Sequence, residues 1–260
     1  PDTLTVDVGG NTGYQTYFHA QYNNVRTYEP VPELFGVLKE NLKAIKKKVT
    51  FVNKAVGSTN KKLTLHVDVN RLSMTSQIPL VDETEPMVVP CVALDKEKLD
   101  NVGFIKIDVE GYELDVLKGA VKVIETFRPT MMVEIYQPWC ENVGFDSREI
   151  FDFFAERDYS ILYYNCETSK MVKCTVDKAV DAVHNLHHLQ EWFHLHLHQH
   201  WPRCRQCFQF PPVPRYLECS IWSLPPSFSS MCYPTWLHPT YRCRWPISFH
   251  EHWSLLSSFA

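Results

Sequence analysis

The chain has 260 residues, 45% of them hydrophobic, which suffices for one sizeable domain with an appendage or for two small domains. Its formal net charge of −4 gives no global reason to expect nucleic acid or an anionic membrane as a partner. Nine irregularly spaced cysteines do not form a disulfide framework, and no apolar run reaches the roughly 20 residues of a membrane span, so we expect a cytoplasmic protein by default.

The first informative segment, LTVDVGGNTG at 4–13, predicts a strand, a tight turn and the start of a helix. Its glycines let the backbone turn sharply and approach a ligand, toward which the amides of the following helix point. The spacing does not fit the dinucleotide fingerprint G-x-G-x-x-G. It resembles instead the D-x-G-x-N-x-G loop of S-adenosylmethionine (SAM) methyltransferases. The residues that we expect to bind the cofactor here are Asp7, Gly9, Gly10, Asn11 and Gly13.

An acid follows the second expected strand, which covers 25–28. Glu29 stands where this fold holds ribose hydroxyls, and its carboxylate can accept two charge-assisted hydrogen bonds. The alternative is a surface acid before a proline turn. Pro32 then favours a helix start, and an apolar stripe at helical spacing predicts a helix packed on a sheet.

The next segments predict the adenine and acceptor surfaces. Strands at 49–52 and 55–56 end at the ligand edge, where the small Ala55 leaves space for an adenine ring. Residues 61–67 alternate like an exposed hairpin arm, and 68–90 lack periodicity and predict a long loop. We expect this loop, with the segment after Tyr136, to face the acceptor.

Carboxylates follow two further strands. The apolar run 104–107 ends in Asp108 and Glu110, one helix is expected from Leu114 to Arg128, and the strand at 131–135 contains Glu134. Alternating strands and helices predict a doubly wound α/β fold with a parallel sheet, which binds ligands beyond the carboxyl ends of its strands.

Several motifs occur in the order of the FkbM-type methyltransferase family. They are DVGGNTG, YEPVPELFGVLKEN, KAVG, ALD, KIDVEGYELDVLKGA and VEI, and the resemblance covers roughly 4–164. It implies a Rossmann-like, seven-stranded, SAM-dependent methyltransferase fold and methyl transfer, which better-known members direct to hydroxyls of natural products or sugars. By resemblance, Asp108, Glu110 and Glu113 match the D-x-E-G-x-E motif, whereas Gly10 stands where many relatives carry alanine.

We expect Asp108, Glu110 and Glu134 to converge as the catalytic group, with Asp108 as general base and the two glutamates positioning the acceptor. Like charges in a dry cleft cannot all stay ionised, so one carboxyl acquires a raised pKa, or a divalent cation or substrate hydroxyls compensate. We favour no metal, because hard cations recruit more oxygen ligands. Alternatively, acids that open a helix are stabilised by its dipole without chemistry.

The favoured function is SAM-dependent O-methylation of a hydroxyl on a sugar, lipid or small natural product, carried by a domain at 1–180. The acceptor is then a small molecule or glycan. A non-catalytic binding module that keeps the fold is the alternative from another class. A nicotinamide-dependent oxidoreductase remains open, although it needs a different loop.

The composition changes abruptly at about Asn185. All nine glycines and every lysine precede this point, and six of the seven tryptophans follow it. Histidines at 194–200 with Cys204 and Cys207 suggest zinc, but a lone C-x-x-C lacks a second pair. We favour a wrong reading frame or retained noncoding sequence, and we expect 185–260 to be a tail of low order.

Overall fold

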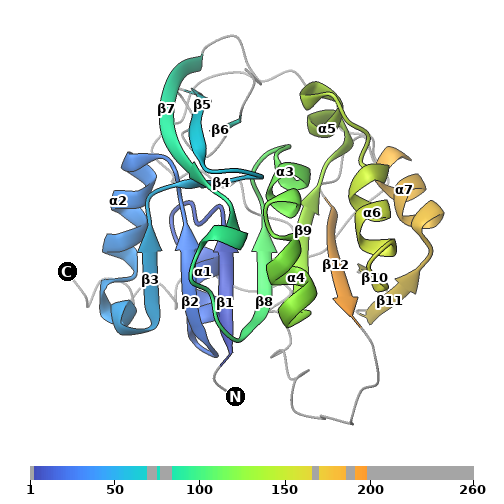
Figure 1. The fold of residues 1–260 in the computed structure, drawn as a ribbon, viewed down its shortest axis with the longest axis horizontal. Helices are drawn as coiled ribbons and strands as arrows, with labels where there is room; N and C mark the ends of the chain where they lie inside the picture. The colour runs from blue at the N-terminus through green and yellow to red at the C-terminus, as the bar shows by residue number, and fades with distance from the viewer. Residues whose placement is uncertain (1–2, 69–74, 77–83, 166–169, 186–190, 198–260) are drawn as a thin grey trace, which may run out of the picture. The chain divides into compact units, whose positions relative to one another are not determined.

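The computed structural model describes residues 3–68, 75–76, 84–165, 170–185 and 191–197. The chain divides into two units, 1–202 and 203–260, and the second lies wholly outside the described residues. Within the first unit, a large sheet has the strand order β11-β10-β12-β9-β8-β1-β2-β3 (Figure 1). Its strands are β1 (Leu4–Val8), β2 (Asn24–Tyr28), β3 (Val49–Val52), β8 (Val102–Ile107), β9 (Thr130–Ile135), β10 (Tyr159–Asn165), β11 (Lys170–Cys174) and β12 (Glu191–Leu197).

Five neighbouring strands, from β9 to β3, are parallel. The central pair β1 and β8 is buried on both faces, since Val6, Val8, Ile105 and Ile107 are each at most 1% exposed. Such continuous burial is typical of parallel strands covered by helices on both sides. The predicted doubly wound α/β fold is therefore confirmed.

Helices cover the sheet with two separate apolar clusters. On one side, α1 (Tyr14–Ala20) and α2 (Pro32–Asn41) bury Ala20, Leu38 and Leu42 against β2 and β3. The larger cluster joins the sheet to α3, α4, α6 and α7. These and the remaining helical segments are η1 (Lys43–Lys48), η2 (Leu94–Lys96), α3 (Glu113–Lys118), α4 (Val121–Phe127), α5 (Gln137–Val143), α6 (Arg148–Ala155) and α7 (Val176–Asn185). None of the helices in the described segments is long and apolar enough to cross a membrane.

The single helix expected at 114–128 is wrong, because the chain forms α3 and α4 instead. Asp95, which belongs to neither helix, contacts the chain between α3 and α4. Its backbone N–H donates to Gly119 O at 2.9 Å, and its carboxylate accepts from the N–H groups of Lys122 and Val123 at 3.1 and 3.0 Å. Asp95 therefore satisfies amides in the first turn of α4, as a capping side chain does.

A second, four-stranded sheet has the order β4-β7-β5-β6. Its strands are β4 (Ala55–Val56), β5 (Lys61–Asp68), β6 (Thr75–Ser76) and β7 (Thr84–Val92). The expected loop at 68–90 is thus wrong where β6 and β7 form, whereas the hairpin arm is confirmed as β5. The strand β7 was not predicted from the sequence because it contains Pro86 and Pro90. A strand tolerates proline where the N–H side is not paired, and among the described residues β7 meets its second neighbour, β4, only at Cys91 and Val92.

The large sheet has eight strands in the described residues rather than the expected seven, because β11 extends its edge beside β10. The strand β12 lies between β9 and β10 and is antiparallel to both. It belongs to the segment expected to be a tail of low order, and the extent of that tail stays a prediction. The remainder of that segment from residue 198 lies outside the described residues.

Candidate active site

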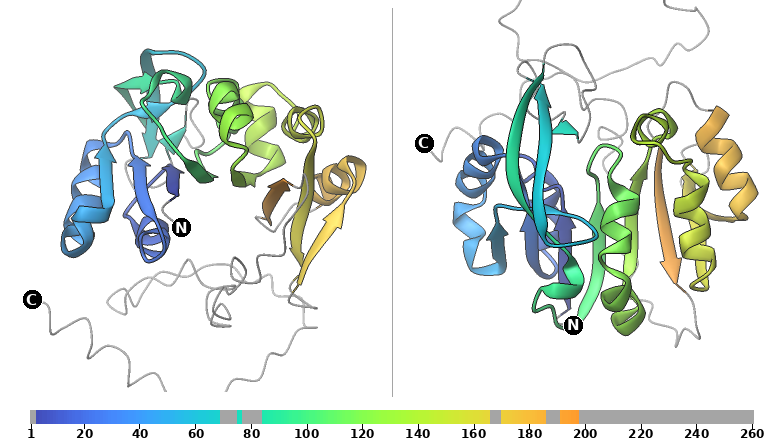
Figure 2. Two further views of the ribbon diagram at one scale, coloured as in Figure 1. Left: turned by 60° about the horizontal axis from the view of Figure 1, so that its bottom comes forward. Right: turned by 45° about the horizontal axis from the view of Figure 1, so that its top comes forward.

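The carboxyl ends of β2, β1, β8 and β9 meet at one edge of the large sheet. In the parallel registers, Val8 lies opposite both Tyr28 and Ile107, and Ile107 lies opposite Val133. The residues that directly follow or end these strands therefore come together, as expected for a ligand site of a doubly wound sheet. The second sheet contacts this edge, because Ser76 Oγ donates to Glu110 O at 3.2 Å. Figure 2 shows both sheets from two further directions.

The glycine-rich turn after β1 is fixed by hydrogen bonds to β2. The N–H groups of Gly9 and Gly10 donate to Tyr28 O at 3.0 and 2.9 Å. Gly9 has φ of 82°, and a Cβ there would lie 1.9 Å from Asp108 O. Glycine at this position therefore permits direct contact between the turn and the end of β8.

Gly10 lies against side chains of β2 and α2, and its predicted contact with the cofactor stays a prediction. A Cβ on it would lie 2.2 Å from Thr27 Oγ1 and 2.6 Å from Leu38 Cδ1. The position thus faces the core between β2 and α2, and an alanine there would force these neighbours to move.

Asp7 is fully buried, with 0% exposure. The hydroxyls of Thr16 and Thr27 donate to its Oδ2, while Oδ1 has no hydrogen-bond partner among the described residues and lies 3.4 Å from Lys106 Nζ. In this structure Asp7 holds the start of α1 and the end of β2 together. Its predicted contact with a cofactor stays a prediction.

Glu29 connects the turn to the end of β2. Its Oε2 accepts from Asn11 N–H at 2.8 Å and its Oε1 from Val31 N–H at 2.9 Å. Burial raises the pKa of Glu29 to about 7, although these two N–H groups lower it. Each carboxylate oxygen keeps a further lone pair for a ligand hydroxyl. Asn11 adopts a left-handed φ of 50°, a conformation that asparagine tolerates.

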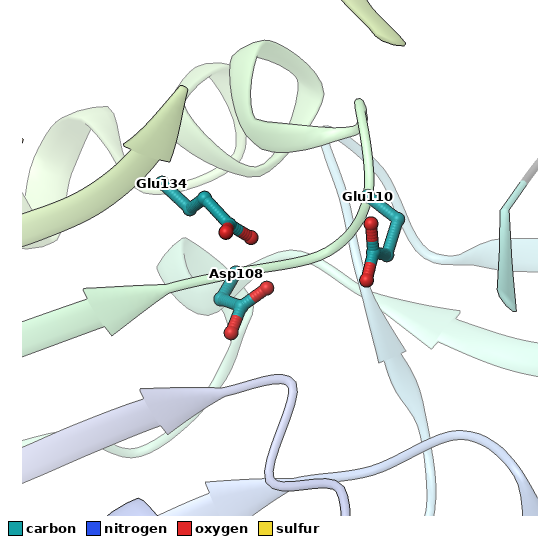
Figure 3. Close-up of side chains that lie close together, drawn as sticks. All are labelled: Asp108, Glu110 and Glu134. Carbon is teal, nitrogen blue, oxygen red and sulfur yellow. The ribbon is translucent and has the colours of Figure 1, made fainter. Parts of the chain in front are cut away.

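The structure brings together the three expected catalytic carboxylates. One oxygen of each of Asp108, Glu110 and Glu134 lies within 4.8 Å of the others (Figure 3). Burial, and next the charge of Asp108, raise the pKa of Glu134 to about 11 and that of Glu110 to about 9. Both glutamates therefore carry a proton at neutral pH and can donate hydrogen bonds. This oxygen set could also hold a cation, so the metal-free site stays a prediction.

The loop that carries Glu110 is shaped by Glu113, a motif residue to which we assigned no role. Glu110 and Gly111 have left-handed φ angles of 54° and 93°. Glu113 Oε1 accepts from the N–H groups of Val109 and Gly111 at 3.1 and 3.2 Å. Burial raises the pKa of Glu113 to about 7 despite these bonds. Glu113 thus holds a strained backbone that directs Glu110.

Sequence reasoning missed Lys106, which is 2% exposed and lies 3.4 Å from both Asp7 Oδ1 and Asp108 Oδ2. The available signal was a lysine in the middle of a strand that is otherwise apolar, since a lysine is almost never fully buried unless it is paired.

The residues of two other candidate sites, for adenine and for zinc, lie outside the carboxylate cluster or outside the described residues. Ala55 is buried in β4 of the second sheet, opposite Cys91, rather than in the large sheet, and its place beside adenine stays a prediction. Of the residues considered for zinc, His194 and His196 fall in β12. The others, from His198 to Cys207, lie outside the described residues.

Among the solved structures similar to this chain are three methyltransferases. Methyltransferase FkbM from Methylobacillus flagellatus KT aligns with a TM-score of 0.48 and 18% identity, over 75% of this chain and 44% of that chain. A precorrin-6y C5,15-methyltransferase from Geobacter metallireducens GS-15 aligns with a TM-score of 0.39 and 8% identity, over 75% and 78%. A SAM-dependent O-methyltransferase from Thermotoga maritima aligns with a TM-score of 0.40 and 10% identity, over 76% and 61%.

The chain spans less than half the length of the Methylobacillus structure. No curated protein sequence matches it. A family model described as the methyltransferase FkbM domain matches residues 7–161, which are more than half of the 260 residues. Since the match includes the glycine-rich turn, Glu29 and all three clustered carboxylates, this chain belongs to the FkbM family of methyltransferases.

Proposed function

We propose that this chain transfers a methyl group from SAM to a hydroxyl oxygen of a sugar, lipid or small natural product. The observation that carries the proposal is the position of the glycine-rich turn, whose Gly9 touches the backbone of Asp108 beside two further carboxylates. A cofactor held by the turn would lie next to groups able to bind and deprotonate a hydroxyl.

The residues present fit the cofactor. The turn from Gly9 to Gly13 would hold its methionine end, Glu29 has two lone pairs for the ribose hydroxyls, and Ala55 is the candidate neighbour of adenine. Asp7 Oδ1, which accepts no hydrogen bond among the described residues, could accept one from a ligand. When bound, SAM supplies a methyl group that is already activated by its sulfonium.

The chain's own residues would position and deprotonate the acceptor. Asp108 Oδ2 lies 3.4 Å from Lys106 Nζ, and the Asp108 side chain is partly exposed. An acceptor hydroxyl could therefore reach Asp108 and give its proton to this carboxylate, which would act as the general base. The protonated carboxyls of Glu110 and Glu134 would donate hydrogen bonds that orient acceptor oxygens. The net charge supports a small or uncharged acceptor rather than nucleic acid.

Calorimetry with S-adenosylhomocysteine (SAH) tests the cofactor site without knowledge of the acceptor. We expect binding to the parent protein and about tenfold weaker binding to Glu29→Gln, a loss of about 1.4 kcal/mol. Glu33→Gln changes an exposed acid in α2 and is the matched control. A folded parent that does not bind SAH, or binds the oxidised nicotinamide cofactor instead, would contradict the proposal.

The same proteins then enter a transfer screen with methyl-labelled SAM over hydroxylated sugars, lipids, small acids and RNA. Asp108→Asn is expected to bind SAH as the parent does but to lose at least a hundredfold in turnover, within the range for a general base. Binding without transfer to any acceptor favours the non-catalytic module, and labelled RNA would exclude the small-acceptor assignment.

A further inference from the structure

A buried lysine contacts both halves of the proposed site. Lys106 Nζ donates to Val8 O at 3.3 Å and to Gly9 O at 2.6 Å, where the glycine-rich turn begins. The same atom lies 3.4 Å from Asp7 Oδ1 and 3.4 Å from Asp108 Oδ2. One ammonium group therefore joins the turn that would hold the cofactor to the carboxylate that would act as base.

The position of Lys106 in the sheet explains this reach. In β8 it lies opposite Asp7 of β1 on one side and Met132 of β9 on the other. Its 2% exposure means that water does not solvate the ammonium, so its protons require protein acceptors. Val8 O, Gly9 O and the Asp108 carboxylate supply them. Asp7 Oδ1 accepts no hydrogen bond among the described residues, but it forms an ion pair with Lys106 Nζ at 3.4 Å.

The groups that act on Lys106 come from every element packed around it. They are Asp7 of β1, His19 of α1, Glu29 after β2, Asp108 and Glu110 after β8, and Glu134 of β9. Burial lowers the pKa of Lys106, but Asp108, Asp7 and Glu134 outweigh it, so the pKa lies above its ordinary value. Burial lowers the pKa of His19, so that the imidazole is neutral at physiological pH. Lys106 is thus the cation that offsets the clustered acids.

We propose that Lys106 is a positioning residue, which fixes the Val8–Gly9 turn against Asp108 and places one positive charge between the carboxylates of Asp7 and Asp108. The inference rests on the proposed methyl transfer. Its consequence is that the cofactor turn and the position of the base depend on one side chain, so removal of that side chain disturbs both.

The test compares the full chain with Lys106→Met, Lys106→Arg and the double variant Lys106→Met with Asp108→Asn. SAH affinity and the urea midpoint of unfolding are measured at pH 5.5 and pH 8. For Lys106→Met we expect at least tenfold weaker SAH binding at pH 8. We also expect a loss of urea midpoint at least twice as large at pH 8 as at pH 5.5, because acids without their cation take up protons as the pH falls.

The other variants separate charge from packing. Lys106→Arg keeps the charge and the donors, so SAH affinity should stay within threefold of the parent. The double variant should recover most of the urea midpoint at pH 8 but not the SAH affinity, since the bonds to Val8 O and Gly9 O remain absent. Lys61→Met is the matched control, because Lys61 of β5 lies 3.8 Å from Asp115 Oδ2 of α3 and so also pairs with a carboxylate, and this variant should bind SAH within twofold of the parent.

Equal SAH binding by Lys106→Met and the parent would overturn the positioning role, and a pH-independent loss of urea midpoint would overturn the charge role. If Lys106→Met does not fold, Lys106→Gln replaces it, as it keeps a donor but no charge. A parent that binds no SAH refutes the proposed function instead, while the urea series still decides the charge role.

Discussion

Glu110 combines a left-handed backbone with a proton that the unfolded chain would release at neutral pH. Burial, followed by the charges of Asp108 and Glu113, raises its pKa to about 9, and Glu113 holds the turn that fixes it. Neighbouring Glu134 is shifted in the same direction. The native state therefore carries protons at this site over a pH range in which free glutamates are ionised.

Stability should consequently fall as the pH rises. A carboxyl with a folded pKa above its unfolded value stabilises the protein below the unfolded pKa, and this contribution is lost as the pH rises through the folded pKa. For Glu110 the window runs from its ordinary pKa of 4.5 to a folded-state pKa of about 9, with a slope of up to about 1.4 kcal/mol per pH unit. Glu110→Gln should flatten the decline in urea unfolding free energy between pH 5 and pH 9.

Glu149→Gln provides the comparison, since Glu149 is an exposed acid in α6. It should follow the parent at every pH. A Glu110→Gln protein whose stability declines as steeply as that of the parent would show that Glu110 does not hold the proton.

Site residues could be predicted from the sequence where an acid lies at or just after the end of a strand. Asp108 and Glu134 could be placed together because parallel strands share one carboxyl edge, and Glu110 followed from the motif. Lys106 could not be recognised in the same way, because its burial depends on Asp7, which is nearly 100 residues away in sequence. The packing role of Gly10 likewise requires the positions of Thr27 and Leu38.

At the scale of elements, the predictions were wrong where a residue or strand distant in sequence decides the structure of a segment. The apolar pattern of 114–128 is continuous, yet Asp95 caps α4 and separates it from α3. The prolines of β7 are typical of loops, yet residues 84–91 of that strand pair with β5. Local periodicity carries no information about either partner.

Asp95→Ala should destabilise the protein by about 1 kcal/mol, because two amides of the first turn of α4 lose their acceptor. Asp95→Asn should cost less, since an amide oxygen can still accept. Urea unfolding measures both, with Asp100→Ala as the control at an exposed position of the following loop. An Asp95→Ala protein as stable as the control would mean that the cap does not contribute.

At the scale of the molecule, the strand β12 lies after the change in composition near Asn185. The doubly wound sheet was predictable from the alternation of strands and helices, but β12 was not, because its segment shares the unusual composition of the residues after it. Its pairing with β9 and β10 is a backbone property, which composition does not report.

Truncated chains distinguish a folded domain that includes β12 from one that ends near residue 180. A chain ending at residue 202 should unfold cooperatively and keep its SAH affinity. A chain ending at residue 188 lacks β12 and should lose about 3 kcal/mol or more, from several ladder hydrogen bonds of about 0.5–1.5 kcal/mol each. Urea unfolding followed by circular dichroism compares them. Equal stability of the two chains would instead support a domain that ends near residue 180.

The place of β12 also sets the order in which the nascent chain can complete its sheet. Ile135 of β9 pairs with Glu191, so the outer edge of β9 has no partner strand until the ribosome has made the last residues of β12. At bacterial or eukaryotic elongation rates this interval is roughly 3–12 s. During it the apolar edge Thr130–Ile135 is exposed to other chains, and an unpaired apolar strand edge is a template for aggregation. Slow translation after residue 135 would therefore lower the yield of folded protein, and a chaperone that shields β9 would restore it.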